Sequence, residues 1–150
     1  MTNTLTIPRR PARKFLPEDF KLTTWEVLKP FFDRLLANEL STATQLKKWL
    51  HDRSELESVL SEDMGWRYIR MTCFTENEEY RNAYQDFVQN IQPRIAPVSD
   101  LLNNKALASP FLFDLEKEPG YDMMIRNLRK DIELFREENI PLFTEISTET

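Results

Sequence analysis

Apolar residues recur at steps of three and four along most of this 150-residue chain, and four helix-start signatures stand where such stripes begin. In each signature a Ser or Thr hydroxyl can accept from the amide three positions on, and the Glu or Gln there reaches back to the first amide. The pattern therefore predicts helices that begin at these points. The signatures are Thr23-x-x-Glu26, Thr42-x-x-Gln45, Ser54-x-x-Glu57 and Thr75-x-x-Glu78.

The first three signatures predict one helix from Thr23, a short one from Thr42, and a longer one from Ser54 to Cys73. Pro30 falls inside the first helix. Because proline lacks an amide hydrogen and clashes with the carbonyl four residues back, a kink or a restart is expected there. The three apolar stripes are Trp25, Leu28, Phe32, Leu35 and Leu36, then Leu46, Trp49 and Leu50, then Leu56, Val59, Leu60, Met64 and Ile69.

The clearest periodicity runs from Asn77 to about Asn104, where seven apolar residues span 22 positions in six steps, close to the helical period. Pro93 and Pro97 lie inside this stripe. Since the apolar face keeps its register beyond them, they predict a bend and not a stop. A continuous helix of this length would run roughly 40 Å, longer than a compact small domain needs. The seven residues are Tyr80, Tyr84, Phe87, Ile91, Ile95, Val98 and Leu102.

Turn-forming residues divide the chain after residue 108. Ser109 and Pro110 predict a cap for a single turn, and Pro119 predicts the first position of another helix. After Pro141 a new apolar pattern begins without a stop signal, so we expect a truncated piece of a longer protein. The residues concerned are an apolar cluster (Phe111, Leu112, Phe113), a stripe (Tyr121, Met124, Leu128, Ile132, Phe135), four-apart ion pairs (Asp122 with Arg126, Arg129 with Glu133) and the final pattern (Leu142, Phe143, Ile146).

Composition supports one all-α domain of long antiparallel helices, arranged as a bundle or hairpin array. The chain is 41% hydrophobic and has only 2 glycines, and its apolar runs are far too short to span a bilayer. Gly65 lies inside a predicted helix, which indicates close packing by a neighbour or a local bend. The single cysteine, Cys73, excludes an internal disulfide, fits a reducing cytoplasm, and is expected to be a small core residue.

Charge separates an N-terminal arm from the helical body. Residues 1–22 contain five basic and two acidic residues, and the total of −5 leaves −8 on residues 23–150. Pro8, Pro11 and Pro17 interleave the basic residues, which favours an extended arm that lies over the body. Because the acidic body would repel phosphates, nucleic-acid binding is the weakest of the functional interpretations.

The residues do not form a recognisable catalytic or metal-binding constellation. His51 is the only histidine, and a zinc site that combines it with Asp52 and Glu55 would lack further ligands. We therefore interpret His51 as a solvated or partly buried side chain beside Trp49. The carboxylate pairs point about 100° apart on a helix, and the two glycines are too isolated for a phosphate loop. The pairs are Glu78-Glu79 and Glu137-Glu138.

Several blocks of sequence together resemble the N-terminal region of the oligoendopeptidase F branch of the thimet-oligopeptidase family of zinc metallopeptidases. The resemblance covers residues 24 to about 145. Its blocks are Thr24-Trp25-Glu26 with Leu35-Leu36, Leu50-His51-Asp52-Arg53-Ser54-Glu55-Leu56-Glu57, Trp66-Arg67-Tyr68-Ile69-Arg70-Met71-Thr72-Cys73, Tyr84 with Phe87-Val88-Gln89-Asn90-Ile91-Gln92-Pro93, Ser99-Asp100-Leu101-Leu102-Asn103, and Asp131-Ile132-Glu133-Leu134-Phe135-Arg136-Glu137-Glu138-Asn139-Ile140-Pro141.

The resemblance implies a helical, cytoplasmic peptidase in which two halves enclose a channel and a zinc ion held by His-Glu-x-x-His and a downstream Glu hydrolyses short peptides. That motif is absent from these 150 residues, so no catalytic or metal-binding residue, zinc or activity is expected here. The expected partners are oligopeptide substrates and the C-terminal catalytic domain of the same chain, with neither nucleic acid nor membrane. The organisation would then be an arm over residues 1–22 and a helical N-terminal domain over residues 23–150.

Arg67 and Arg70 are the candidate contacts with substrate in the channel, because guanidinium groups pair well with peptide carboxylates. The competing interpretation is ordinary ion pairing, or stacking of the side chains over the aromatic core. A different class of function stays open beside the peptidase, namely a stand-alone helical module that binds a partner helix in aromatic grooves.

Overall fold

The computed structural model describes residues 8–131, and this part of the chain contains helices and no strand. The prediction of an all-α fold is confirmed. The elements in chain order are α1 (Trp25–Ala37), α2 (Ala43–Cys73), α3 (Glu78–Asp86), the π-helical turn η1 (Phe87–Ile91), α4 (Gln92–Ala108) and α5 (Leu112–Glu116). A further helix covers residues 122–131 at the end of the described range. No helix of the described chain is long and apolar enough to cross a membrane.

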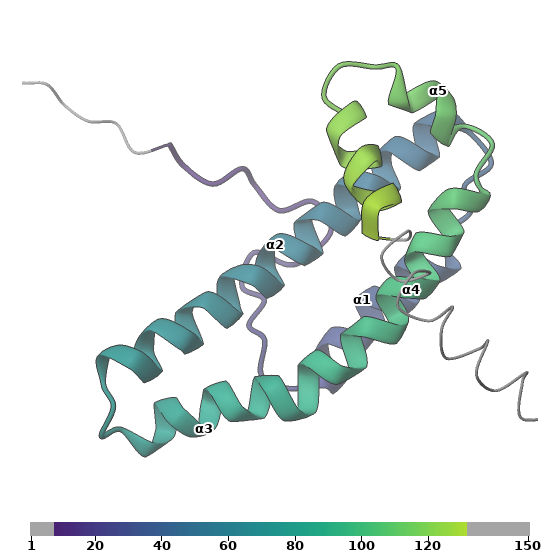
Figure 1. Ribbon diagram of the computed structural model, residues 1–150. Helices are drawn as coiled ribbons and strands as arrows, with labels where there is room; N and C mark the ends of the chain where they lie inside the picture. The colour runs from purple at the N-terminus through teal and green to yellow at the C-terminus, as the bar shows by residue number, and fades with distance from the viewer. Residues whose placement is uncertain (1–7, 132–150) are drawn as a thin grey trace, which may run out of the picture.

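The longest helix, α2, organises the arrangement of the others. After Cys73 the chain turns and returns along α2 as α3, and η1 and α4 continue the same path (Figure 1). The shorter α1 contacts both α2 and α4. The small helix α5 contacts α2 and lies beside its beginning, far from the α2–α3 turn (Figure 1). One end of the molecule is therefore a packed bundle, and the other is a two-helix projection.

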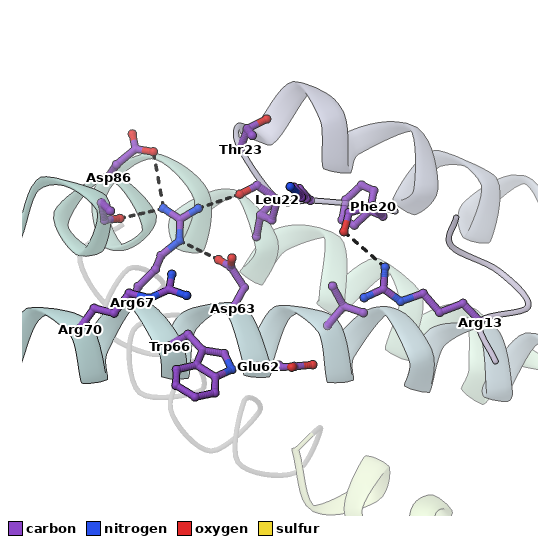
Figure 2. A pocket seen from close by; sticks show the side chains of 13 residues that line it. Arg13, Phe20, Leu22, Thr23, Glu62, Asp63, Trp66, Arg67, Arg70 and Asp86 are labelled. Carbon is purple, nitrogen blue, oxygen red and sulfur yellow. Dashed lines mark hydrogen bonds and ion pairs between the residues drawn. The ribbon is translucent and has the colours of Figure 1, made fainter. Parts of the chain in front are cut away.

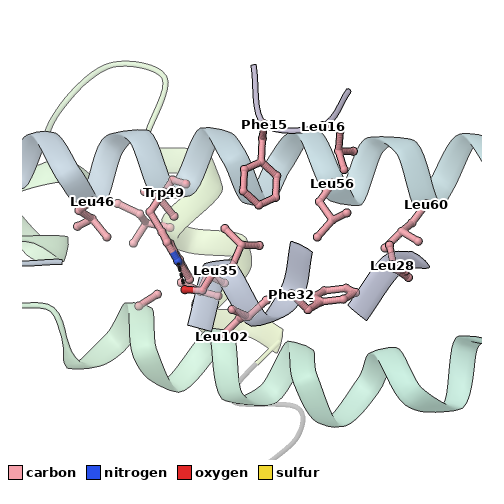
Figure 3. Packing of buried hydrophobic residues seen from close by; sticks show 14 of the residues in the cluster. Phe15, Leu16, Leu28, Phe32, Leu35, Leu46, Trp49, Leu56, Leu60 and Leu102 are labelled. Carbon is pink, nitrogen blue, oxygen red and sulfur yellow. Dashed lines mark hydrogen bonds between the residues drawn. The ribbon is translucent and has the colours of Figure 1, made fainter. Parts of the chain in front are cut away.

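The hydrophobic core fills the space between α1, the first half of α2 and α4. Figure 3 shows these side chains meeting, with α1 between the two longer helices. Three residues of the N-terminal arm, Phe15, Leu16 and Leu22, are also buried in this core, so this part of the arm packs onto the bundle. The core residues labelled on the three helices are Leu28, Phe32 and Leu35 of α1, Leu46, Trp49, Leu56 and Leu60 of α2, and Leu102 of α4.

Side chains from two other helices satisfy carbonyl groups at the C-terminal end of α1. The Trp49 indole Nε1 donates to the Leu35 carbonyl at 2.8 Å, and the Lys105 ammonium donates to the Leu36 carbonyl at 2.6 Å and to that of Asn38. The last carbonyls of a helix lack partners within it, and a cation there also interacts favourably with the helix dipole. These contacts fix the end of α1 against α2 and α4.

Only one of the four predicted capping signatures is confirmed. Thr42 and Gln45 form a complete capping box at the start of α2. At α1 the N-cap is Thr24 and not Thr23, and its side chain makes no capping hydrogen bond. Helix α3 is capped by Asn77 and not Thr75; the Asn77 side chain accepts from the Tyr80 amide.

The predicted helix start at Ser54 is wrong, because α2 runs unbroken for 31 residues from Ala43 to Cys73. The buried side chains Leu50 and Leu56 lie on either side of Ser54 in the same apolar stripe. Since that stripe keeps its helical spacing, burial favours continuation of the helix over a cap at this point.

The prolines do not end the helices. Helix α1 contains Pro30 and does not restart there. The expected continuation past Pro93 and Pro97 is confirmed, because α3, η1 and α4 follow one another without a break, and the path bends where α3 passes into α4 (Figure 1). The wide turn of η1 lies directly before Pro93, which has no amide to donate and whose ring crowds the carbonyl four residues back.

Two residues of the projecting half of α2 differ from expectation. Cys73 is exposed, so the prediction of a core cysteine is wrong. Within residues 8–131, no heavy atom outside the backbone of its own helix turn lies within 4 Å of the place a Cβ of Gly65 would take, so none of these residues packs closely against it. Both corrections have one cause: α2 leaves the core after Leu60.

The turn after α5 also differs from the sequence prediction. The helix there begins at residue 122, so Pro119 precedes it and is not its first residue. Gly120 takes a positive φ of 92°, which favours glycine. Arg129 pairs with Glu116 at 2.6 Å, whereas the predicted partner Glu133 lies outside the described residues, as do Ile132, Phe135, Leu142, Phe143 and Ile146.

The apolar cluster of residues 111–113 is confirmed only in part. Leu112 is buried, and the Ser109 hydroxyl accepts from the Phe111 amide at 3.4 Å. Phe113 is exposed, and the Arg129 guanidinium lies 5.0 Å from the centre of its ring. A single helical turn can point only part of such a cluster inward.

Candidate functional site

A groove of about 740 Å³ lies between the N-terminal arm, α2 and α3. The arm contributes the residues around Phe20 and Leu22, α2 contributes one long face, and α3 contributes the carboxylate of Asp86 (Figure 2). We call this the arm–hairpin groove. Its lining residues are Arg13, Phe20, Lys21, Leu22, Thr23, Val59, Glu62, Asp63, Trp66, Arg67, Arg70, Ala83 and Asp86.

Arg67 connects the three elements that form this groove. Its guanidinium donates to the Asp63 carboxylate at 2.7 Å, to the Ala83 carbonyl at 2.8 Å and to the Leu22 carbonyl at 2.9 Å. Its side chain is only 11% exposed, and Asp86 lies 4.0 Å away (Figure 2). A planar guanidinium is suited to several such directed bonds at once. In the described structure Arg67 therefore joins α2 to α3 and to the arm.

Asp63 has an unusual electrostatic environment for an ion-paired carboxylate. Burial raises the pKa of Asp63 above its ordinary value, and the ion pair with Arg67 offsets only part of this shift. Removing a carboxylate from water disfavours its charged form, and one well-placed cation returns only part of that free energy. The charged form of Asp63 therefore depends on the neighbouring guanidinium of Arg67.

Arg70 and Trp66 form the more accessible side of the groove. The Arg70 guanidinium lies 5.8 Å from the centre of the Trp66 ring, and Trp66 is 51% exposed. Within residues 8–131, Arg70 has no carboxylate within 4.0 Å, in contrast to Arg67. A cation over an aromatic face keeps its hydrogen-bond donors available. The arrangement therefore offers a cationic and an aromatic surface to a ligand in the groove.

The two predicted site residues thus lie at the same groove but in different environments. The donors of Arg67 are largely used by the protein itself, which matches the ion-pairing interpretation of this residue. Arg70 is exposed and stacks on Trp66. Binding of a peptide by either residue stays a prediction.

The arm that borders the groove is held by Glu55, a residue whose role the sequence did not indicate. Its carboxylate accepts from three consecutive amides, those of Lys14, Phe15 and Leu16, at 2.7, 2.9 and 2.7 Å. Burial raises the pKa of Glu55, but the three amides together with Arg13 lower it by more, so the pKa lies below its ordinary value. The charged form of Glu55 is therefore the one that binds the arm.

Arg13 shapes the arm itself. Its guanidinium donates to the carbonyls of Pro17 and Phe20 at 2.9 and 3.3 Å, and its amide donates to the Glu18 carboxylate at 2.6 Å. These bonds close a loop over residues 13–20 and place Phe20 against Phe31 of α1, with ring centres 5.2 Å apart. The arm is thus an ordered border of the groove.

The described residues do not fit a catalytic zinc. No group of three or more His, Cys, Asp or Glu side chains that could hold a metal ion occurs within residues 8–131. His51 is exposed, and its Nε2 lies 3.0 Å from the Tyr121 hydroxyl and not beside the carboxylates that a metal would require. Structural zinc needs four protein ligands and catalytic zinc three.

Comparison with protein families identifies the class of this chain. The family of the Peptidase M3 N-terminal domain matches residues 15–135, which include every helix from α1 to α5 and every residue that lines the arm–hairpin groove except Arg13. The chain belongs to this family and carries the N-terminal domain of an M3 peptidase. No curated protein and no solved structure gave a match.

Proposed function

We propose that this chain is the N-terminal helical portion of a zinc-dependent oligopeptidase, located in the cytoplasm, that hydrolyses peptide bonds in short peptides. In this proposal the arm–hairpin groove forms part of one wall of the substrate channel, and the chain has no activity alone. The observation that carries the proposal is the match to the M3 peptidase N-terminal domain over most of the chain.

The geometry of the groove supports the proposed contact with peptides. It is large enough for several residues of an extended chain, and it combines an aromatic side chain, Trp66, with a cation, Arg70. Carboxylates are also present at the groove, at Glu62 and Asp86. Peptides carry both charges and apolar side chains, so a lining of mixed character suits a broad range of short peptides.

This chain's own residues would bind and orient the peptide. Arg70 would pair with a peptide carboxylate, while Trp66 would pack against an apolar side chain. Zinc would polarise the scissile carbonyl and activate water, but the described residues do not provide its ligands, so that chemistry belongs to the remainder of the longer enzyme.

The proposal is tested by comparing this chain with the longer protein encoded by the same reading frame. Zinc content and cleavage of a quenched fluorogenic oligopeptide are measured for both. We expect a zinc-containing, chelator-sensitive longer protein and an inert 150-residue chain. If the longer protein also lacks zinc and activity, the peptidase proposal fails, and the helical interaction module becomes the better interpretation.

The role of Arg70 has a separate test in the longer protein. Arg70→Ala should raise the KM for peptides with a free C-terminal carboxylate by about tenfold, the loss of one charge-assisted hydrogen bond, and should leave C-terminally amidated peptides unchanged. Arg126→Ala is a matched control, because Arg126 is exposed and lies on a different helix. Unchanged kinetics of Arg70→Ala on free-carboxylate peptides would remove this residue from the channel.

A further inference from the structure

Two side chains of opposite charge on the α2 wall of the arm–hairpin groove have no ion-pair partner in the described chain. Glu62 and Arg70 both line the groove and are exposed, and neither forms an ion pair or a side-chain hydrogen bond within residues 8–131. Both belong to the hairpin, by which we mean residues 61–86, the second half of α2 and α3 with the turn between them. Each is therefore available to a ligand in the groove.

The other charges close to this wall are already used by the protein. Asp63 pairs with Arg67 at 2.7 Å, and Asp86 lies 4.0 Å from the same guanidinium. The Arg13 guanidinium donates to carbonyls of the arm, at 2.9 and 3.3 Å. Lys21 is a further exposed cation, which the arm contributes to the groove. The α2 wall itself thus offers one carboxylate and one guanidinium whose charges are not compensated by a close partner.

The spacing of these two charges is set by the helix. Glu62, Trp66 and Arg70 follow one another at steps of four along α2 and so form one stripe (Figure 2). Eight residues of an α-helix rise about 12 Å. Helical side chains lean towards the N-terminus of their helix, so both ends of the stripe lean the same way and this offset is largely kept. The Arg70 guanidinium accordingly lies 5.8 Å from the centre of the Trp66 ring, one turn earlier.

A short peptide with free ends carries the complementary pair of charges, and its length fixes their separation. Each residue of an extended chain adds about 3.3–3.6 Å, so about 12 Å corresponds to three or four residues. An extended dipeptide is too short to reach both side chains, and the termini of an extended hexapeptide lie about 20 Å apart. The stripe therefore matches the free termini of a tripeptide or a tetrapeptide.

We propose that Glu62, Trp66 and Arg70 form a subsite that holds free tripeptides and tetrapeptides by both ends. Glu62 accepts hydrogen bonds from the α-ammonium group, Arg70 donates to the α-carboxylate, and Trp66 packs against a side chain between them. This inference rests on the proposed function, which assigns the groove to peptides, and it adds a preferred length and Glu62 as a specificity-determining residue. Because all unmodified peptides share these termini, the subsite selects length and free ends and not sequence.

Peptide binding tests this subsite without any need for catalysis. Ligand-observed NMR titration gives the Kd for the 150-residue chain and for the metal-free longer protein, after circular dichroism has shown that both are helical. The probes are the tripeptide Ala-Leu-Ala, its N-acetylated and C-amidated forms, the dipeptide Ala-Leu and the hexapeptide Ala-Leu-Ala-Ala-Leu-Ala.

The free tripeptide should bind most tightly of these probes. Blocking either end should raise the Kd by about threefold to fivefold, the size of one exposed charge pair. The dipeptide and the hexapeptide should show a similar loss, because each can place only one terminus on the stripe. Equal Kd values across the series would overturn the proposal.

Variants assign each terminus to its residue. Glu62→Gln should weaken binding of the free tripeptide by about threefold to fivefold and leave the N-acetylated form unchanged, because that form has no ammonium to lose. Arg70→Gln should weaken the free tripeptide and leave the C-amidated form unchanged. Glu76→Gln is the matched control, since Glu76 is exposed in the turn of the hairpin and does not line the groove.

Glu62 is exposed, so its replacement should not change helicity. An equal loss for the free and the N-acetylated tripeptide in Glu62→Gln would contradict the assignment of the ammonium to Glu62, because the effect would then not depend on that group.

The outcomes separate this inference from the proposed function. A longer protein that cleaves peptides, but whose binding depends neither on length nor on free ends, would overturn the subsite alone. Selective binding of free tripeptides by a longer protein without zinc and peptidase activity would overturn the proposed function alone.

Discussion

The two halves of α2 form one continuous helix, yet they lie in opposite environments. Between residues 43 and 60 the helix buries five apolar side chains in the core and also Asp52, and between residues 61 and 73 it buries none. The two tryptophans summarise the contrast, since Trp49 is 1% exposed and Trp66 is 51% exposed. One regular helix thus serves as a core element in its first half and as a projecting support in its second.

This difference teaches that helical continuity does not imply uniform stability. The first half is held by apolar burial against α1 and α4, whereas the second depends on hydrogen bonds from Arg67, on the Asn77 cap and on contact with α3. Segments with few buried apolar contacts open at lower free energy than the core. The hairpin is therefore expected to open more easily than the bundle.

The largest expected effect contrasts the two tryptophans of α2. Trp49→Ala should destabilise the protein by about 3–5 kcal/mol, because it leaves a cavity and also removes the indole donor to the Leu35 carbonyl. Trp66→Ala should change the free energy of unfolding by less than about 1 kcal/mol. Urea denaturation of both variants measures the difference. Equal losses would contradict the division of α2 into a core half and an exposed half.

Arg67 offers the second way to separate the two regions. Arg67→Ala should lower the free energy of unfolding by about 1.5–3 kcal/mol, because it leaves the partly buried Asp63 without its cation. The loss should appear as faster amide exchange in residues 61–86 and not in α1. Arg67→Lys should recover little of the free energy of unfolding that Arg67→Ala loses, since an ammonium lacks the planar group of donors that reaches three acceptors.

Arg70→Ala is the matched control for this prediction. Arg70 lies one turn further along the same helix and stacks on Trp66 without a carboxylate partner in the described chain. The Arg70→Ala variant should leave the amide exchange of residues 61–86 unchanged. An equal effect of the two alanine variants would mean that the three bonds of Arg67 do not hold the hairpin.

The third prediction concerns the arm at the border between the two regions. Glu55→Gln should weaken arm binding by about 1–2 kcal/mol, because a neutral amide oxygen accepts the three amide hydrogens less strongly than a carboxylate. Trypsin should then cleave faster after Arg13 and Lys14. Glu57→Gln is the control, since Glu57 is exposed and its one ion pair within residues 8–131 is with Arg53.

The Glu55 contribution also has a defined pH dependence. Its pKa is lower in the folded protein than the ordinary value of 4.5, so its stabilisation is present above that value and is lost as the pH falls through the folded pKa. The stability difference between wild type and Glu55→Gln should therefore shrink below about pH 4.5. A difference that stayed constant from pH 7 to pH 3 would exclude the charge as its source.

Much of the fold follows from apolar spacing alone. The stripe from Tyr80 to Leu102 predicts a helix that continues past two prolines, and this is confirmed because burial of Phe87, Ile91 and Leu102 requires a continuous register. Local capping signals proved weaker. Ser54 has the right neighbours for a cap, but core packing on both sides of it outweighs about 1 kcal/mol of capping.

The groove was less accessible from sequence than the fold. Asp63 and Arg67 stand four apart on a helix, so their pairing has a local signal, but the two other acceptors of Arg67 are main-chain carbonyls distant in sequence. The same holds for Glu55, whose partners are amides about 40 positions away. Main-chain groups occur at every residue, so the sequence pattern does not indicate which of them a distant side chain contacts.

Gly65, in the exposed half of α2, gives the smallest expected effect. Since no neighbour from the described part of the chain lies within 4 Å of its added Cβ and its helical conformation suits alanine, Gly65→Ala should stabilise the 150-residue chain by about 0.5–1 kcal/mol in thermal unfolding. A loss of stability would mean that the space beside Gly65 is filled in solution.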